Sequence, residues 1–204
     1  MIKTLRITAL VALASSVAFA CEPAPKAQCN GADLRDQDLS SLDLRGIELK
    51  GADLRGADLR HSNLNDANLS GADLREADLT RARLEQASLR GVRADHANLT
   101  AISGWALFAQ GGSFVNARFD GADLSFSRFS GANLMGASLY AATLEMSWLS
   151  KARLDGADLR NADLQEAKLY NASLMNADLT GSHIRFGIFQ DTAMDGCTAC
   201  PFDW

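Results

Sequence analysis

The chain has 204 residues, of which 47% are hydrophobic and 22% charged, and this balance excludes a collagen-like, mucin-like or disordered polar chain. Its length fits one soluble domain or one repeat array. The 20 Lys and Arg and the 25 Asp and Glu give a net charge of −5, so the surface as a whole disfavours nucleic acid and anionic lipid as partners.

Residues 1–20 resemble a secretory signal peptide. Two basic residues precede an apolar run over 7–14, and the A-F-A sequence at 18–20 supplies the small residues that a signal peptidase recognises. The run is shorter than the roughly 20 apolar residues that a membrane-spanning helix needs, and no later stretch approaches that length. We therefore expect an exported, periplasmic protein that begins at Cys21, with a net charge of −7 once Lys and Arg of the leader are removed. Two alternatives stay open, namely lipidation of Cys21, as in bacterial lipoproteins, and a buried helix in a cytosolic protein.

A period of five residues organises the chain from Leu34 to Met194. Of the 33 positions in this series, 24 are Leu, four are Phe, and Ile and Met occur once each. Ala usually stands two residues earlier and Gly often two residues later, as Ala52 and Gly56 do around Leu54. Five steps of a helix would scatter these leucines around its axis, and in a continuous strand they would alternate between the two faces. The chain must therefore turn once per repeat, so that each short extended piece points its Leu and the preceding Ala inward.

Several of the repeats carry a specific motif. The sequences A-D-L-R-G at 52–56, A-N-L-S-G at 67–71 and A-D-L-R-N at 157–161 resemble the pentapeptide-repeat family, whose motif is A-(D/N)-L-x-x. The resemblance covers about residues 27–194 and implies an all-β fold, a right-handed quadrilateral β-helix with four pentapeptides per coil and about eight coils. The chain then divides into a signal peptide at 1–20, an N-terminal segment with the start of the first coil at 21–30, the β-helix at 31–194 and a C-terminal cap segment at 195–204.

Three repeats lack a large central residue. Each has a large residue two positions earlier: Val92 with Ala94, Ile102 with Gly104 and Leu107 with Ala109. Exchanging large and small residues between two inward positions conserves the core volume, so we interpret 101–112 as a repacked coil that stays in register. A loop over the same residues, containing Gly111 and Gly112, remains an alternative.

The interior of such a coil is filled by leucines from four sides, which leaves no lumen for a substrate or cofactor. Outside, Asp and Arg alternate beside the central Leu, as is typical of a solvated surface of mixed charge. The separations of His61, His96 and His183 are not multiples of the expected coil length, so these residues form no metal site. No phosphate-binding loop or nucleophile motif occurs. We therefore expect no catalytic, metal or cofactor site.

One outer edge of the C-terminal half is predicted to be apolar if residues 20 apart stack. Two neighbouring lines then carry six large apolar side chains, which form the candidate interaction edge: Phe108, Phe126, Met146, Trp148, Phe186 and Ile188. Contiguous exposed apolar surface usually marks association, so we expect this edge to contact a partner protein or a second copy of the chain. The alternative is that these side chains stack on neighbouring coils and only stabilise the rod.

The four cysteines lie near the two ends of the repeat array. Cys29 occupies an inward slot of the first repeat, whereas Cys197 and Cys200 form a C-x-x-C sequence after the last one. Open ends of a solenoid need covering, so we interpret these residues as structural disulfides. Pairing Cys21 with Cys29 and Cys197 with Cys200 is the simplest of three connectivities. A redox-active dithiol at the C-terminus remains an alternative, and this end is a second candidate contact for a protein partner.

These features predict a non-catalytic, exported β-solenoid that serves as a structural or protein-interaction module of the bacterial envelope. The family resemblance implies a second candidate, a DNA-mimicking protein that binds a topoisomerase, which the net charge permits but the leader and the Arg beside nearly every early Asp do not favour. A third candidate is a thiol-active envelope protein that uses Cys197 and Cys200. Neither nucleic acid nor a spanning membrane segment is expected.

Overall fold

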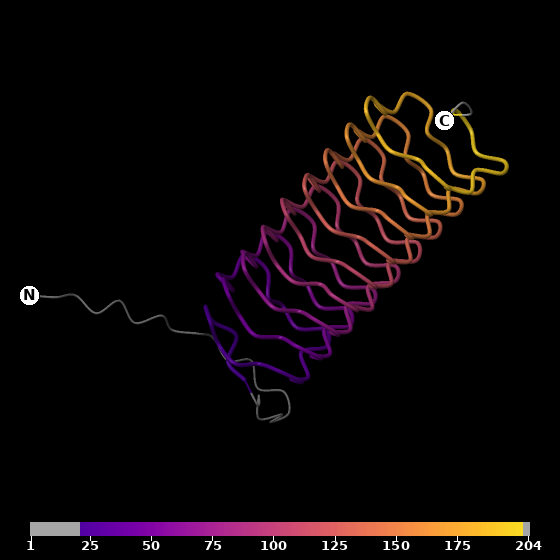
Figure 1. Cartoon of the computed structure of the whole chain (residues 1–204). Coiled ribbons are helices and arrows are strands. Elements are labelled where there is room, and N and C mark those ends of the chain that lie inside the picture. The colour runs from indigo at the N-terminus through magenta and orange to yellow at the C-terminus, as the bar shows by residue number, and fades with distance from the viewer. Residues whose placement is uncertain (1–20, 202–204) are drawn as a thin grey trace, which may run out of the picture.

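In the computed structural model, which describes residues 21–201, the chain winds into a rod of stacked coils (Figure 1). This part of the chain contains no helix and no strand longer than one residue. Instead, every fifth residue from Gln28 to Thr198 forms a parallel β-bridge, and turns lie between the bridges. The predicted all-β architecture is therefore reduced to single bridging residues, because each side of the coil turns before a second pair can form. The predicted signal peptide lies outside the described residues.

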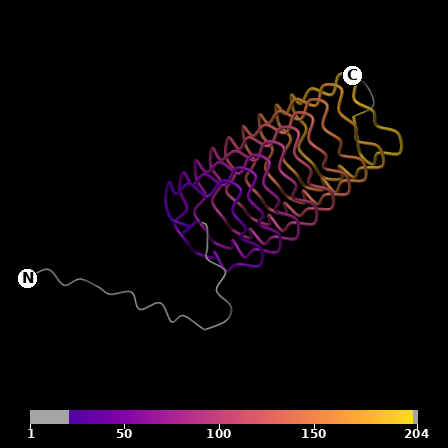
Figure 2. The same cartoon turned by 90° about the horizontal axis from the view of Figure 1, so that it is seen from below.

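The bridges fix the register of the coils. Each joins a residue to the one 20 positions later, from Gln28 with Glu48 to Asp178 with Thr198. Twenty residues are four pentapeptides, so the coil has four sides, as the sequence predicts. Hydrogen bonds run along the rod: the Leu54 N–H donates to the Asp73 carbonyl at 2.7 Å, and the Asp73 N–H donates to the Ala52 carbonyl at 2.9 Å. Each inner coil is thereby hydrogen-bonded to the coil before it and the coil after it, and Figure 2 shows the stacked coils from below.

Four faces run along the rod, and we name each after a leucine of its inward line: the Leu34, Leu39, Leu44 and Leu49 faces. They follow one another in this order around the coil. The Leu49 face therefore lies opposite the Leu39 face and shares corners with the other two.

The interior is filled by the residues that the period of five singles out. The central side chains from Leu34 to Leu179 are buried, as are the Ala residues that precede most of them. Phe114, Phe119 and Phe129 form a cluster of edge-to-face rings, with centroids 5.5 to 6.0 Å apart. Surface hollows occur on the outside, for example beside Arg35, Arg55 and Arg75. Within the described residues, the surface that a partner or ligand could reach is the outside of the rod and its ends.

The weak repeats continue the coil without interruption. Ser103 bridges Arg83 and Asp123, and Phe108 bridges Ser88 and Arg128, so 101–112 stays in register and is not a loop. A Cβ built on Gly104 would lie 3.1 Å from Leu124 Cδ2, which shows that the interior is already full there. The exchange of volume between the two inward positions thus explains the small central residues.

Each corner of the coil adopts the left-handed backbone conformation. Every fifth residue from Lys26 to Gly196 has a positive φ, and 13 of these corners are Gly. Gly adopts this conformation without steric cost, which explains its preference for the slot two residues after the central one. The other corners carry a side chain in spite of that cost.

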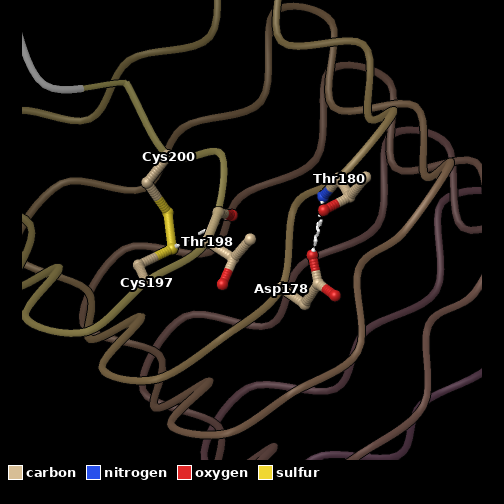
Figure 3. Close-up of a disulfide and its surroundings, with 5 residues drawn as sticks. All are labelled: Asp178, Thr180, Cys197, Thr198 and Cys200. Carbon is tan, nitrogen blue, oxygen red and sulfur yellow. Dashed lines mark hydrogen bonds between the residues drawn. A yellow bond between two sulfur atoms is a disulfide. The ribbon is translucent and has the colours of Figure 1, made fainter.

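The two ends of the rod carry the cysteines, which lie in two pairs. Cys21 is bonded to Cys29 with their Cα atoms 5.2 Å apart, and Cys197 to Cys200 with Cα atoms 5.8 Å apart. The second pair lies beside the last bridge, between Asp178 and Thr198 (Figure 3). Within residues 21–201 no helix is long and apolar enough to cross a membrane.

Candidate functional site

The six residues of the candidate interaction edge lie along the corner between the Leu44 and Leu49 faces. Phe126, Met146 and Phe186 occupy corner positions with positive φ. The bridges place the other three residues on the adjacent line, in the order Phe108, Arg128, Trp148, Lys168 and Ile188. The two lines that the sequence predicts are therefore neighbours in the fold.

The exposure of these side chains is uneven. Phe126, Trp148 and Phe186 are 44%, 45% and 64% exposed, whereas Phe108, Met146 and Ile188 are half-buried. The edge therefore exposes three aromatic side chains to solvent, and its other three side chains are partly covered.

Trp105 also belongs to this edge, and the sequence analysis missed it. Its side chain is 43% exposed, and its ring lies 5.9 Å from that of Phe126. Trp105 belongs to a line of residues spaced 20 apart, and the other members of this line are polar: Ser125, Glu145, Gln165 and Arg185. The sequence feature that could have identified Trp105 is its position next to Ala106, the small residue that begins the corner line of Phe126.

Cations are interleaved with the aromatic rings. Lys168 Nζ lies 3.9 Å from the ring centre of Trp148, and the Arg90 guanidinium lies 4.5 Å from that of Phe108. Arg185 lies at the same distance from the ring of Phe186. Such contacts stabilise the rod by about 0.5–1 kcal/mol each at exposed sites. The stacking alternative thus accounts for part of the edge, and most directly for Phe108, which is half-buried under its cation.

Backbone conformation separates the corner residues from the rest. Phe126 and Phe186 both have a φ of 59° and Met146 one of 54°. A side chain in the left-handed conformation costs roughly 1–2 kcal/mol, and a bulky residue there is uncommon. The backbone at these three corners favours Gly, so the large apolar side chains carry a conformational cost that ring contacts offset only in part.

Ion pairs between Asp or Glu and Arg occur on the Leu34, Leu39 and Leu44 faces. On the Leu34 face each early Asp accepts two hydrogen bonds from the Arg two residues later, as Asp53 does from Arg55 at 2.8 and 2.7 Å. The hydrogen bond from Arg35 lowers the pKa of Asp33 to about 2. A carboxyl group with a lowered pKa is a poor general acid, because it carries no proton near neutral pH.

The cysteines and histidines form no further cluster. The pairing of Cys21 with Cys29 and Cys197 with Cys200 is the simplest connectivity of the sequence analysis, and both C-terminal cysteines are at most 8% exposed. Across the described part of the chain no three His, Cys, Asp or Glu residues are arranged to hold a metal ion. His183 lies on the Leu44 face, whereas His61 and His96 occupy corners at the two borders of the Leu39 face.

Comparison with protein families supports this architecture. A family model described as pentapeptide repeats matches the chain in eight copies, over residues 27–66, 67–102, 117–156 and 149–181. The internal stretch without a match, 103–116, contains most of the repacked coil. No curated protein matches the sequence.

Among solved structures, 33 chains match. HetL from the cyanobacterium Nostoc sp. strain PCC 7120, a pentapeptide repeat protein involved in heterocyst differentiation regulation, is 28% identical over 83% of this chain and 91% of its own, with a TM-score of 0.45. A trypsin-treated variant of QnrB1, a plasmid-mediated fluoroquinolone resistance protein, is 19% identical over 81% of this chain and 88% of its own, with a TM-score of 0.66. The likeness to QnrB1 shows a shared right-handed β-solenoid fold.

Proposed function

Since the chain belongs to the pentapeptide repeat family, we propose that it is an exported, non-catalytic β-solenoid that acts as a structural or protein-interaction module of the bacterial envelope. The observation that carries this proposal is the exposure of Phe126 and Phe186, 44% and 64%, at corners whose backbone disfavours them. A side chain that costs conformational free energy and still lies in solvent is explained more simply by contact with a partner than by the fold.

The proposal of a non-catalytic role follows from the filled interior and the paired charges. Leucine and phenylalanine side chains occupy the space where an enclosed site would lie. The early aspartates are bound to arginine, which holds the pKa of Asp33, Asp43 and Asp53 below its usual range. Binding through the outer surface is the function that such a molecule supports best.

The proposal of export is supported by a disulfide at each end of the rod, because disulfides persist in oxidising compartments. A Cys21 sulfur that is bonded to Cys29 has no valence left for a thioether to lipid, so we propose a form without a lipid anchor. Mass analysis of the unreduced protein tests both points. The expected mass is that of a chain that begins at Cys21 and lacks the four thiol hydrogens. An added diacylglyceryl mass, or free thiols, would contradict it.

The two other candidates find less support in the geometry. A DNA mimic needs carboxylates that present free negative charge, and on the Leu34 face Asp33, Asp53 and Asp73 are each bound to Arg. A thiol-active protein needs an accessible sulfur, and Cys197 and Cys200 are 8% and 5% exposed. We therefore retain the interaction module.

Crosslinking in cells tests the edge. A photoreactive phenylalanine derivative in place of Phe126 should form a discrete adduct with a protein, either a second copy or another chain. Tyr140 is the matched control position, because it is 43% exposed and lies on the opposite side of the Leu44 face from this edge, on the Leu39 face. Equal adducts from both positions, or none from position 126, would refute the proposed contact.

A stability measurement separates contact from mere stacking. Phe186→Gly should leave the midpoint of thermal unfolding unchanged or raise it, because Gly is favoured at a φ of 59°. The same substitution, combined with Phe126→Gly, should abolish the adduct formed from position 146. A marked loss of stability in Phe186→Gly would instead support the stacking alternative.

A further inference from the structure

The charge of the rod is distributed unequally over its four faces. The repeats of the Leu34, Leu39 and Leu44 faces hold 5, 4 and 3 basic residues against 8, 6 and 7 acidic ones. The repeats of the Leu49 face hold 5 basic residues against 2 acidic ones, Glu48 and Asp191. One face of an acidic protein is therefore basic, and we call it the basic face. Its cations are Lys50, Arg90, Arg128, Lys151 and Lys168.

The cations of the basic face differ from the others in their partners. On the other three faces, ten of the 12 Lys and Arg residues lie within 4.0 Å of a carboxylate. Within residues 21–201, none of the five cations of the basic face has such a neighbour. Arg90 and Arg128 lie against the ring of Phe108 instead, and Lys168 against that of Trp148. The positive charge of this face is thus uncompensated by the protein itself.

The basic face is also bare along one of its borders. Six successive corners there are glycine, and the structure leaves open space where each Cβ would stand: Gly31, Gly51, Gly71, Gly91, Gly111 and Gly131. Over these six coils no side chain stands at this border, and Lys151, Asn171 and Asp191 continue it toward the C-terminal end. On the other border, Trp148 is 45% exposed, and Tyr170 is half-buried within the face. Aromatic residues with a polar group favour the boundary between lipid and water.

We propose that the basic face docks the rod side-on to an anionic phospholipid bilayer. A planar, negatively charged surface complements a flat face whose cations lack partners, and the three acidic faces orient the rod by repulsion. The expectation from net charge that anionic lipid is disfavoured applies to the three acidic faces and not to the basic one. A symmetric dimer through the basic face is opposed by its own charge. This inference goes beyond the proposed function, because it assigns a lipid partner to the basic face, which shares the line of Trp148 with the apolar edge but not the corner line of Phe126 and Phe186.

Cosedimentation with vesicles tests the inference. The protein should bind vesicles of equal parts phosphatidylglycerol and phosphatidylcholine, should not bind phosphatidylcholine alone, and should be released by raised salt. The triple variant Arg128→Gln, Lys151→Gln and Lys168→Gln should bind about a hundredfold more weakly, at roughly fivefold per cation.

The matched control is Arg60→Gln, Arg118→Gln and Arg160→Gln, which makes the same change of charge on the opposite, Leu39 face. It should bind within about twofold of the unaltered protein. Equal losses in the two triple variants, binding to neutral vesicles, or no binding to anionic ones would each overturn the inference. The last result is also the one expected if an acidic protein occupies this face.

The edge variant Phe126→Gly with Phe186→Gly keeps this test separate from that of the proposed function. It should lose the protein adduct formed from position 146 and retain most of its vesicle binding. The basic-face variant should keep the adduct and lose most of its vesicle binding. If vesicle binding needs the two phenylalanines and not the three cations, the basic face is not the docking surface.

Discussion

The two inward positions of each repeat share one fixed volume, and this constraint acts on single residues. A Cβ built on Gly112 would lie 2.7 Å from Cε2 of Phe114, and one on Gly187 would lie 2.8 Å from Cε2 of Phe189. A central phenylalanine at these sites is therefore accommodated by glycine two residues earlier. The same rule operates in the opposite direction where Ile102 accompanies Gly104.

We predict that Gly112→Ala lowers the free energy of unfolding by about 1–3 kcal/mol through overpacking. The backbone of Gly112 lies outside the left-handed region, so the effect is steric. Phe114→Leu in the same chain should restore part of the loss. Gly111→Asn is the control, because its φ of 65° suits Asn and nothing lies within 4 Å. Urea unfolding measures all four proteins, and an unchanged Gly112→Ala would show that the coil can expand.

Two buried serines offer a test in the stabilising direction. Ser127 and Ser147 are fully buried, and within the described residues their hydroxyls have no hydrogen-bond partner. Ala fills the same slot at Ala167, in the next coil. We predict that Ser127→Ala and Ser147→Ala each raise the free energy of unfolding by about 1 kcal/mol, because an unsatisfied polar group leaves the core.

Ser62 is the control for this pair. It is equally buried, but its hydroxyl donates to the Leu59 carbonyl at 2.7 Å. Ser62→Ala should therefore be neutral or destabilising in the same denaturation experiment. A gain at Ser62 as large as that at Ser127 would show that hydroxyl burial, with or without a partner, decides the outcome.

At the scale of structural elements, the ion-pair ladder of the Leu34 face makes stability depend on pH. The Asp73 side chain is only 6% exposed and accepts contacts from Arg75 and Arg93, both at 2.7 Å. The hydrogen bond from Arg75 lowers the pKa of Asp73 below its ordinary 3.8. A group whose pKa is depressed by folding stabilises the protein above its unfolded pKa, and this contribution is lost as the pH falls through the folded value.

We therefore predict that Asp73→Asn destabilises the protein at neutral pH and flattens the fall in stability below about pH 4. Asp43→Asn is the comparison, because the Asp43 side chain is 45% exposed and has one arginine partner. Its effect should be smaller, since solvent screens an exposed pair. Urea unfolding at several pH values measures this, and parallel curves for Asp73→Asn and the unaltered protein would contradict the assignment.

Periodicity explains why so much of these elements is predictable from the sequence. Leu, Ala and Gly recur at fixed places in the repeat, where they respectively fill the core, pack beside it and turn the corner. The register of 20 residues then orders the outer lines, so the sequence places the line of Phe126 beside the line of Trp148, as the fold does.

The remaining features depend on side-chain directions that periodicity does not set. Trp105 leans toward Phe126 from a line that is otherwise polar. Lys168 lies against Trp148 and not against a carboxylate. The negative net charge of the chain also gives no sign that the face of Lys168 is basic. The sequence also does not say how short the β-structure is: a side that turns every five residues leaves only one bridging residue.

For the whole molecule, the stacking of similar coils predicts additive stability. Each coil contacts only its neighbours, so removing one should weaken the rod without unfolding it. Deleting residues 57–76 removes one coil and joins Gly56 to Ala77, which keeps the period and all four faces. We expect a modestly lower midpoint of thermal unfolding, an unchanged circular dichroism per residue and an intact adduct from position 126. Global unfolding of this variant would show cooperation over longer distances than neighbouring coils.

A coil of four similar sides also allows evolution to change the direction in which the candidate interaction edge points. Tandem duplication of a single pentapeptide within the first coils would turn everything beyond it by a quarter revolution, yet leave leucine beneath leucine. The candidate interaction edge would then point in a different direction relative to the N-terminal end, although none of its residues had changed. Homologues that gain or lose repeats in multiples of four should conserve the direction of the edge. Homologues that gain or lose other numbers of repeats should present the edge to a different partner.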